Sequence, residues 1–271
     1  NMIDPFHLEA YGVTTVNYNR DIEIFPVVKR ICARIMSPEQ LYKSPTDMGV
    51  NRVGFAITDD EVCRRAATQE IIRRYFQYMC AHALGNADKI ASERVKLLMD
   101  DLGITEFDRR VVAPARAAAE EAEKQPGKGS KNIFCGAALE LPDGTIVTGK
   151  NSPLLHAASS CILNAVKILA KLPDDLFLLS PQVIDSVSQL KKKIYKNKGV
   201  SLDLGETLTA LSVSVPTNPA AQLAMKKLSR LAGCEMHISH LPTPGDELAL
   251  RKLGIHVTSE PRFTSRNLFM E

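Results

Sequence analysis

Apolar residues recur every three or four positions over residues 59–84, and this spacing predicts an amphipathic helix. Thr58 and Glu61 stand in the relation of a capping box at its start, and Gly85 follows its end. The apolar face consists of Val62, Ala66, Ile72, Phe76, Met79 and Ala83.

The opposite face of this predicted helix is charged. Glu61 with Arg65, and Glu70 with Arg74, are pairs four residues apart, which each stabilise an exposed helix by about 0.2–0.5 kcal/mol. A solvated surface is one interpretation. The other is that this face contacts a ligand or partner through Arg64, Arg73 and Arg74.

The pattern predicts two further helices before a break. One covers residues 87–101, and the next begins after Thr105 and passes Pro114 into a stretch rich in Ala and Glu, which are strong helix formers. The segment 125–130 then combines Pro, Gly and Ser, which is typical of a linker. We therefore predict a mainly helical bundle domain over residues 1–127, with a short strand and loop segment near 40–58, and a second domain over residues 128–271.

The second domain has a different pattern. Strand-like runs at 132–141 and 145–149 flank the turn residues Pro142, Asp143 and Gly144, which predicts a β-hairpin. Further strands are predicted at 208–215, 235–239 and 254–258. Four helices are predicted to start where a capping residue precedes Pro, at Ser152, Ser180, Asn218 and Thr243. The fold class is therefore α+β or α/β, with a mixed sheet flanked by helices.

Composition narrows the function classes. A net charge of +3 over 271 residues, without a basic stripe that carries aromatics, argues against nucleic acid as a partner. No apolar run approaches the roughly 18 residues needed to cross a membrane. The six cysteines form no CxxC pair, which indicates reduced thiols in a cytoplasmic protein. Asp4, His7 and Glu9 form only an incomplete ligand set, so we predict no metal site.

One loop has the composition of an anion site. Hydroxyl groups, an ammonium group and turn residues around Gly49 could bind a phosphate, although the spacing is not that of a Walker motif. An ordinary connecting turn explains the same residues equally well. The candidate ligand-binding residues here are Lys43, Ser44, Thr46, Asp47 and Asn51.

Several stretches carry a resemblance to a known family. PFHLEAYG, VNYNRDIEIFP, YKSPTDMGVN, DDEVCRRA and QEIIRRYF together resemble the bacterial domain of unknown function 1846, or uncharacterised protein family 0371. The resemblance covers essentially the whole chain and implies that it corresponds to about the C-terminal half of longer proteins. The other half would be a nucleotide-binding-like partner in the same protein, and the chain itself would be a fragment.

The stretch GAALELPDGTIVTGKNSPLLHAA is also similar to the start of the cytidine-deaminase-like fold. In that fold a hairpin leads into a helix whose His binds zinc and whose Glu, two residues later, transfers protons. His156 matches the His, but Ala158 stands where the Glu is needed, and Thr217-Asn218-Pro219 replaces the second cysteine motif. The resemblance therefore implies the fold without zinc deamination.

If this fold holds, helices starting at Pro153 and Pro219 direct their N-termini toward one pocket, where their unpaired N–H groups favour an anion. The pocket would be lined by Asn151, Ser152, His156, Thr217 and Asn218. The alternative explanation is that these residues only cap helices and that His156 is a buried, hydrogen-bonded histidine.

Two hypotheses for the function remain. The first is a cytoplasmic enzyme acting on a nucleotide or another phosphorylated ligand. The second is a non-catalytic module for interaction or homo-oligomer formation on a degenerate deaminase-like scaffold. The sequence identifies neither a reaction nor a cofactor.

Overall fold

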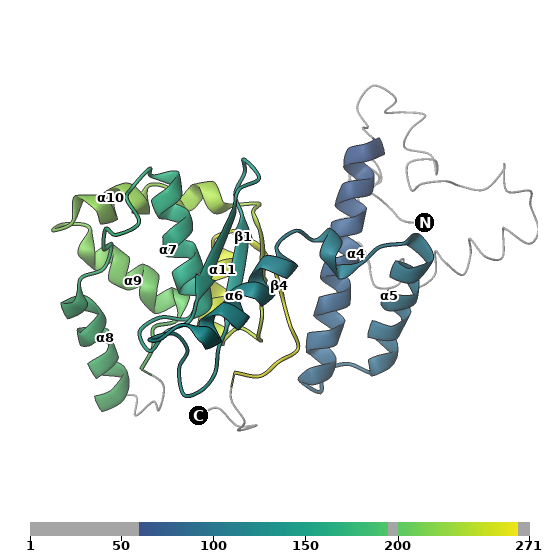
Figure 1. Cartoon of the computed structure of the whole chain (residues 1–271), viewed down its shortest axis with the longest axis horizontal. Coiled ribbons are helices and arrows are strands. Elements are labelled where there is room, and N and C mark those ends of the chain that lie inside the picture. The colour runs from purple at the N-terminus through teal and green to yellow at the C-terminus, as the bar shows by residue number, and fades with distance from the viewer. Residues whose placement is uncertain (1–59, 195–199, 265–271) are drawn as a thin grey trace, which may run out of the picture. The chain divides into compact units, whose positions relative to one another are not determined.

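The computed structural model describes residues 60–194 and 200–264 (Figure 1). The chain divides into two compact units, one made of residues 1–78 with 87–108 and the other of residues 79–86 with 109–271. The Lys43 loop, the Asp4 to Glu9 segment and the Thr58 cap lie outside the described residues.

The first helices match the predicted pattern. Helix α4 (Asp60–Ala83) and helix α5 (Lys89–Leu102) confirm the helices predicted at 59–84 and 87–101. Gly103 ends α5 in the left-handed region with φ of 66°, and its N–H is bonded to the carbonyl of Asp100. Glycine adopts this conformation without the steric cost that a Cβ would add.

The predicted continuous helix from Thr105 through Pro114 is wrong. A single 3-10 turn, η3 (Glu106–Asp108), comes first, because the Asp108 carboxylate accepts hydrogen bonds from the Thr105 N–H and hydroxyl, at 2.6 and 3.0 Å. Helix α6 (Val112–Lys124) then starts afresh. Pro114 is its third residue, where a missing N–H removes no helical hydrogen bond.

The sheet of the second unit has four strands in the order β2-β1-β3-β4. Its strands are β1 (Gly136–Glu140), β2 (Ile146–Lys150), β3 (Glu235–Ile238) and β4 (His256–Ser259). β1 is antiparallel to β2 and to β3, while β3 and β4 are parallel, so the predicted mixed sheet is confirmed. The predicted hairpin is also confirmed, with the Leu141 N–H bonded to the Thr145 carbonyl at 2.8 Å.

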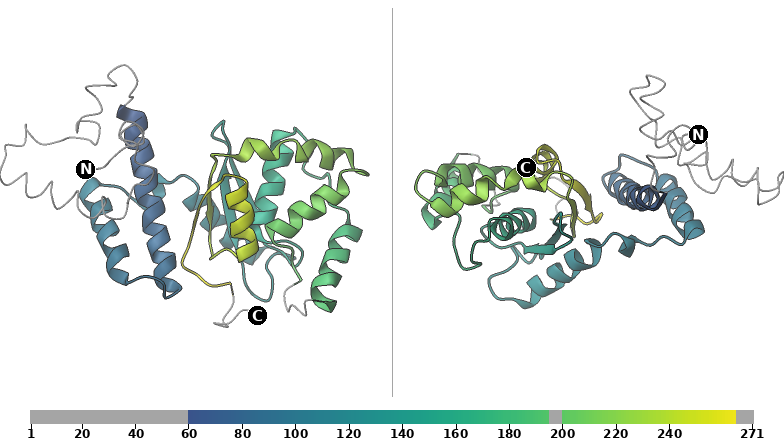
Figure 2. Two further views of the ribbon diagram at one scale, coloured as in Figure 1. Left: turned by 180° about the vertical axis from the view of Figure 1, so that it is seen from behind. Right: turned by 90° about the horizontal axis from the view of Figure 1, so that it is seen from above.

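Two glycines allow helices to approach the two faces of this sheet closely. A Cβ on Gly136 would lie 2.3 Å from the Ala115 carbonyl oxygen of α6, and one on Gly149 would lie 2.2 Å from the Cys161 nitrogen of helix α7 (Ala157–Leu169). Gly149 is paired with Ala137, the neighbour of Gly136. Because successive residues of a strand point to opposite faces, α6 and α7 cover opposite faces of the sheet (Figure 2).

The remaining helices are α8 (Pro181–Lys193), α9 (Leu204–Ser214), α10 (Pro219–Met225) and α11 (Pro244–Lys252), with a 3-10 turn η4 (Leu228–Leu231) after α10. Ser180, Asn218 and Thr243 cap α8, α10 and α11 as predicted, and Pro follows each cap. The fourth predicted start, at Ser152, is wrong. The Ser152 hydroxyl accepts from the N–H groups of Leu154 and Leu155 in a turn, and α7 begins only after His156.

The strand predicted at 208–215 is also wrong, because residues 208–214 belong to α9 and Val215 is its C-cap. Asp203 and Glu206 form a complete capping box at its start, in which each side chain accepts the other residue's backbone N–H at 2.9 Å. The buried side chains then follow helical spacing, at Leu204, Thr207, Ala210, Leu211 and Ser214. The local start signal and the burial periodicity outweigh the strand propensity of the Val and Thr residues.

One apolar core joins the sheet to α7, α9 and α11. Leu139, Ile162, Leu211, Met236 and Leu250 are all fully buried in it. The starts of α7, α9 and α11 come together at Asp246, and α7 also packs against strand β2 at Gly149. Across the ranges that the structure describes, no helix has the length and apolar character needed to cross a membrane.

Candidate functional site

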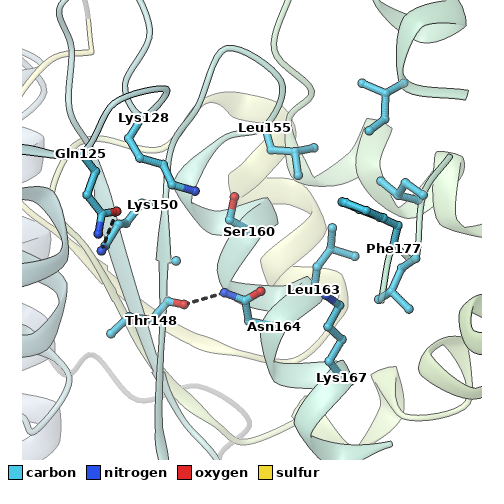
Figure 3. Close-up of a pocket in the computed structure, with 14 residues that line it drawn as sticks. Gln125, Lys128, Thr148, Lys150, Leu155, Ser160, Leu163, Asn164, Lys167 and Phe177 are labelled. Carbon is cyan, nitrogen blue, oxygen red and sulfur yellow. Dashed lines mark hydrogen bonds between the residues drawn. The ribbon is translucent and has the colours of Figure 1, made fainter. Parts of the chain in front are cut away.

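A cavity of about 460 Å³ lies between α7, strand β2 and the segment that leads into α8 (Figure 3). Four of its lining residues come from α7, at Ser160, Leu163, Asn164 and Lys167. These positions are three, four and seven residues apart, so they share one face of the helix. The volume falls within the usual range for small-molecule sites, which is about 300–1,000 Å³.

Three lysines line the cavity, and none of the described residues that line it is a carboxylate. Lys150 donates to Glu121 at 2.7 Å and to the Gln125 amide oxygen at 3.1 Å. Lys167 donates to the Asp174 backbone carbonyl at 2.7 Å. Lys128 forms no hydrogen bond or ion pair with any residue in the described part of the chain. Lys128 and Lys150 therefore give the cavity a positive side with donor capacity left over, while Lys167 lies near Leu163 and Phe177 on the other side (Figure 3).

Two uncharged polar groups lie between the lysines. The Asn164 amide donates to the Thr148 carbonyl at 2.9 Å, which satisfies an acceptor on the outer strand of the sheet. Its own carbonyl oxygen and the Ser160 hydroxyl have no partner within residues 60–194 and 200–264. Both can hydrogen-bond to a molecule in the cavity.

The other side of the cavity is mainly apolar. It is formed by Leu155, Leu163, Phe177, Leu178, Leu179 and Ile184. Phe177 is 79% exposed, an unusual position for an aromatic ring. Asn218 holds the backbone beneath it, since its amide donates to the carbonyls of Phe177 at 3.0 Å and Leu178 at 3.3 Å.

A second polar centre pairs His156, the N-cap of α7, with Asp246 in the first turn of α11. The imidazole Nδ1 lies 2.7 Å from Oδ2 of Asp246. The same carboxylate accepts from the Leu204 N–H at 2.8 Å and the Thr243 hydroxyl at 2.7 Å. The starts of α7, α9 and α11 therefore converge on the buried Asp246 carboxylate, so the protein itself supplies an anion at this point.

This environment shifts both pKa values. Burial opposes ionisation of Asp246, but the hydrogen bond and charge of His156 and the donors from Thr243 and Leu204 lower its pKa. Burial likewise opposes protonation of His156, and the contact with Asp246 more than compensates, so the pKa of His156 is raised. Asp246 also fixes the proton of neutral His156 on Nδ1, which leaves Nε2 as an acceptor.

Four of the five predicted site residues of this unit are bonded to the backbone, and His156 is bonded to a side chain. Asn151 is buried, where it accepts from the Cys135 N–H at 2.8 Å and donates to the Ile133 carbonyl at 2.9 Å. The Thr217 hydroxyl donates to the Ser214 carbonyl at 3.4 Å. Asn218 caps α10, and Ser152 closes the turn before α7. His156 points to Asp246, and none of these five lines the cavity.

The other candidate residues lie elsewhere. Arg73, in α4, is bonded to Glu70 at 3.0 Å, in keeping with the charged helix face. Lys43, Ser44, Thr46, Asp47 and Asn51 fall outside the described residues, so the phosphate-loop hypothesis stays a prediction.

The sequence interpretation did not identify the residues that the cavity brings together. Lys128 stood inside the predicted linker, and Ser160, Asn164 and Lys167 belonged to a predicted apolar helix. A signal was present, because these three polar residues recur with a spacing of four and three on an otherwise apolar helix. Asp246 had no such signal, because its partner His156 lies 90 residues away in the sequence.

Comparisons with known proteins give a consistent family. The model described as "Domain of unknown function DUF1846, N-terminal" matches residues 1–103, and "Domain of unknown function DUF1846, C-terminal" matches residues 107–269. The interval between them lies close to the division of the two compact units at residues 108 and 109.

Similar proteins of known sequence belong to the same family. A "UPF0371 protein" of Clostridium botulinum (strain Alaska E43 / Type E3) is 49% identical over 270 residues, 99% of this chain and 53% of the relative. Similar proteins in Clostridioides difficile and Fusobacterium nucleatum are 48% and 49% identical, over 99% of this chain and 53% and 54% of their own lengths. The chain thus spans about half the length of these relatives, and it belongs to the bacterial DUF1846 (UPF0371) family of unknown function.

Proposed function

We propose that the second unit binds a small phosphorylated or otherwise anionic molecule in the α7 cavity, as part of an enzyme that acts on a nucleotide or another phosphorylated ligand. The observation that carries this proposal is the set of three lysines on a cavity without a lining carboxylate. Hydrogen bonds between an ammonium group and a phosphate are about twice as strong as those between neutral groups.

The present partners of the lysines leave them able to bind a ligand. An ammonium group has three donors, and Lys150 uses two of them. Its partner Glu121 is 61% exposed, so water can replace the lysine at low cost if a phosphate draws it inward. Lys128 supplies a third positive group from the turn after α6, on the same side as Lys150 (Figure 3).

We also propose that the second unit has a cytidine-deaminase-like fold. It is supported by the hairpin β1–β2 that leads into α7, and by the parallel pair β3–β4 joined through α11 on the other side of β1. The resemblance implies a His within this helix, whereas His156 is the N-cap of α7 and its partner is a carboxylate of the same chain. We further propose a cytoplasmic location, which the unbridged thiols of Cys80, Cys135, Cys161 and Cys234 support.

The test of ligand binding is isothermal calorimetry, with inorganic phosphate, adenosine monophosphate and uncharged adenosine as probes. We expect at least one phosphate-bearing probe to bind, and Lys128→Gln to weaken it about tenfold, which corresponds to the loss of one charge-assisted bond. Lys226→Gln, an exposed lysine at the end of α10, serves as the matched control. Equal affinity in the wild type and in Lys128→Gln would reject this cavity as the anion site.

The interaction module is the second candidate. Ile90 and Leu97 lie two helical turns apart on α5, and each is more than half exposed, a pattern that an association surface would explain. Light scattering on the purified chain tests this alternative. A dimer that dissociates in Leu97→Glu would support it, and a monomer at all accessible concentrations would reject it.

A further inference from the structure

The two sides of the cavity differ in chemistry, because basic side chains lie on one side and mainly apolar side chains on the other. Figure 3 shows Lys128, Lys150 and Gln125 on one side and the Phe177 ring on the other, with Ser160 and Asn164 of α7 between them. We propose that the ligand is a phosphomonoester that carries a flat apolar or aromatic group, with the phosphate at Lys128 and Lys150 and the flat group on Phe177. This inference rests on the proposed function, and it specifies the ligand class.

The lysine side suits a phosphate group in particular. Three donor groups line this part of the cavity: the ammonium groups of Lys128 and Lys150, and the hydroxyl of Ser160. A phosphomonoester presents three terminal oxygens, each of which accepts such bonds. A carboxylate carries a single negative charge, whereas a phosphate ester carries about −1.5 to −2 at pH 7 and therefore suits two ammonium groups better.

The apolar side suits a flat group. A phenylalanine side chain that is 79% exposed leaves most of its ring in water, and a second ring placed against it would remove apolar surface of both from water. Leu155 and Leu163 continue the apolar surface toward α7. An anion without such a group would leave this half of the cavity in contact with water alone.

The Phe177 ring is held ready for this contact. Asn218 donates to the carbonyls of Phe177 and Leu178 while its side-chain oxygen caps α10 through Ala220 and Ala221. The backbone under the ring is thus attached to a helix start, which reduces the entropy lost when a ligand orders it. Asn218 is therefore a positioning residue for Phe177, and it does not contact the ligand.

The test compares three probes by calorimetry: inorganic phosphate, phenyl phosphate and phenol. We expect phenyl phosphate to bind about tenfold more tightly than inorganic phosphate, because only it reaches both sides. Phe177→Ala should remove this advantage and leave the affinity for inorganic phosphate unchanged. Because Phe177 is exposed, the variant should fold. Leu176→Ala, an exposed neighbour that does not line the cavity, is the control.

The outcomes separate this inference from the proposed function. If inorganic phosphate and phenyl phosphate bind equally and Lys128→Gln weakens both, the cavity is an anion site and the flat-group inference is rejected. If phenol binds as tightly as phenyl phosphate, or if neither phosphate compound binds, the inference is rejected. The proposed function fails as well if adenosine monophosphate also does not bind. An advantage for phenyl phosphate that persists in Phe177→Ala also overturns the inference.

Discussion

The Nδ1 atom of His156 lies 2.7 Å from Oδ2 of Asp246, a carboxylate 90 residues later in the sequence. The His156 side chain is 26% exposed and that of Asp246 only 5%. A buried carboxylate is stable when donors surround it, and here the donors come from the starts of α9 and α11 as well as from His156. The pair therefore joins three helices to one another.

Asp246→Asn should destabilise the second unit by about 1–3 kcal/mol at a pH of about 6. The pKa of His156 is raised above its ordinary value of 6.5, so its protonated form stabilises the fold fully below that value. This contribution disappears as the pH rises through the raised pKa. The contribution of Asp246, whose pKa is lowered from 3.8, is present throughout this range. The difference between wild type and variant should therefore be smaller at about pH 9.

Urea unfolding at the two pH values measures this difference. Asp185→Asn, which removes an exposed carboxylate on α8, is the control and should change the free energy of unfolding by less than about 0.5 kcal/mol. A destabilisation by Asp246→Asn that is the same at both pH values would show that His156 does not share its proton with Asp246.

Gly149→Ala should destabilise the packing of α7 on the sheet by about 1–3 kcal/mol or more. The added Cβ would lie 2.2 Å from the Cys161 nitrogen and 2.6 Å from the Ala157 carbonyl oxygen, and these backbone atoms cannot move without shifting the helix. Thermal unfolding provides the measurement. Gly205→Ala is the control, because its Cβ would be 3.4 Å from the nearest atom, an ordinary contact. Similar stability of both variants would contradict the close approach.

Arg109→Met should cost about 3–5 kcal/mol, whereas Arg110→Met should cost less than about 1 kcal/mol. The Arg109 guanidinium is fully buried and donates to Glu235, to the Thr258 hydroxyl at 2.9 Å, and to the backbone carbonyls of Met236 and His256 at 2.9 and 2.8 Å. It thereby joins β3 to β4, and its loss leaves buried acceptors without donors. Arg110 pairs with Glu140 but is 62% exposed.

Chemical denaturation of the two variants makes this comparison, since they change adjacent residues to the same apolar side chain. If both lost the same stability, burial of the guanidinium would not be the cause. A smaller loss in the double variant Arg109→Met with Glu235→Gln than in Arg109→Met alone would identify the unpaired Glu235 carboxylate as part of the cost.

Local signals in the sequence predicted most element positions. The caps of Ser180, Asn218 and Thr243 and the turn at Pro142 to Gly144 act over a few residues, so they can be read without knowledge of the fold. Three predictions were wrong. The helix predicted from Thr105 is replaced by a 3-10 turn that Asp108 stabilises. The other two errors arose where local signals compete. Residues 208–215 have strand propensity but follow a capping box, and Ser152 has a Pro after it but closes a turn. Tertiary contacts decide such cases.

The candidate site was harder to predict because it depends on pairs that are distant in sequence. His156 was singled out, but its partner Asp246 was not, since no local pattern links them. The lysine cavity joins residues from Gln125 to Ile184, and each of them alone fits an ordinary helix face or turn. Lys128 and Lys226 are both exposed, and only the fold shows that Lys128 lines the cavity while Lys226 does not.

Glu260→Gln should destabilise the second unit at neutral pH, and the difference from wild type should shrink as the pH falls below about 4.5. Burial opposes ionisation of Glu260, but His237 and Arg116 donate to it, at 3.2 and 2.6 Å, and lower its pKa from 4.5 to about 2. Its ionised form thus stabilises the fold above pH 4.5, and this stabilisation is lost as the pH falls toward 2.

As the pH falls, His237 causes a first loss of folding stability before Glu260 causes the second. Burial lowers its pKa below 6.5, so the unfolded chain binds a proton before the folded protein does, and stability starts to fall below pH 6.5. Urea unfolding at about pH 7, 5.5 and 3.5 separates the two steps, with the exposed Glu247→Gln on α11 as the control. A constant difference between wild type and Glu260→Gln over this range would mean that Glu260 keeps an ordinary pKa. A shrinking difference would assign the lower step of acid unfolding to the contacts of Glu260 with His237 and Arg116.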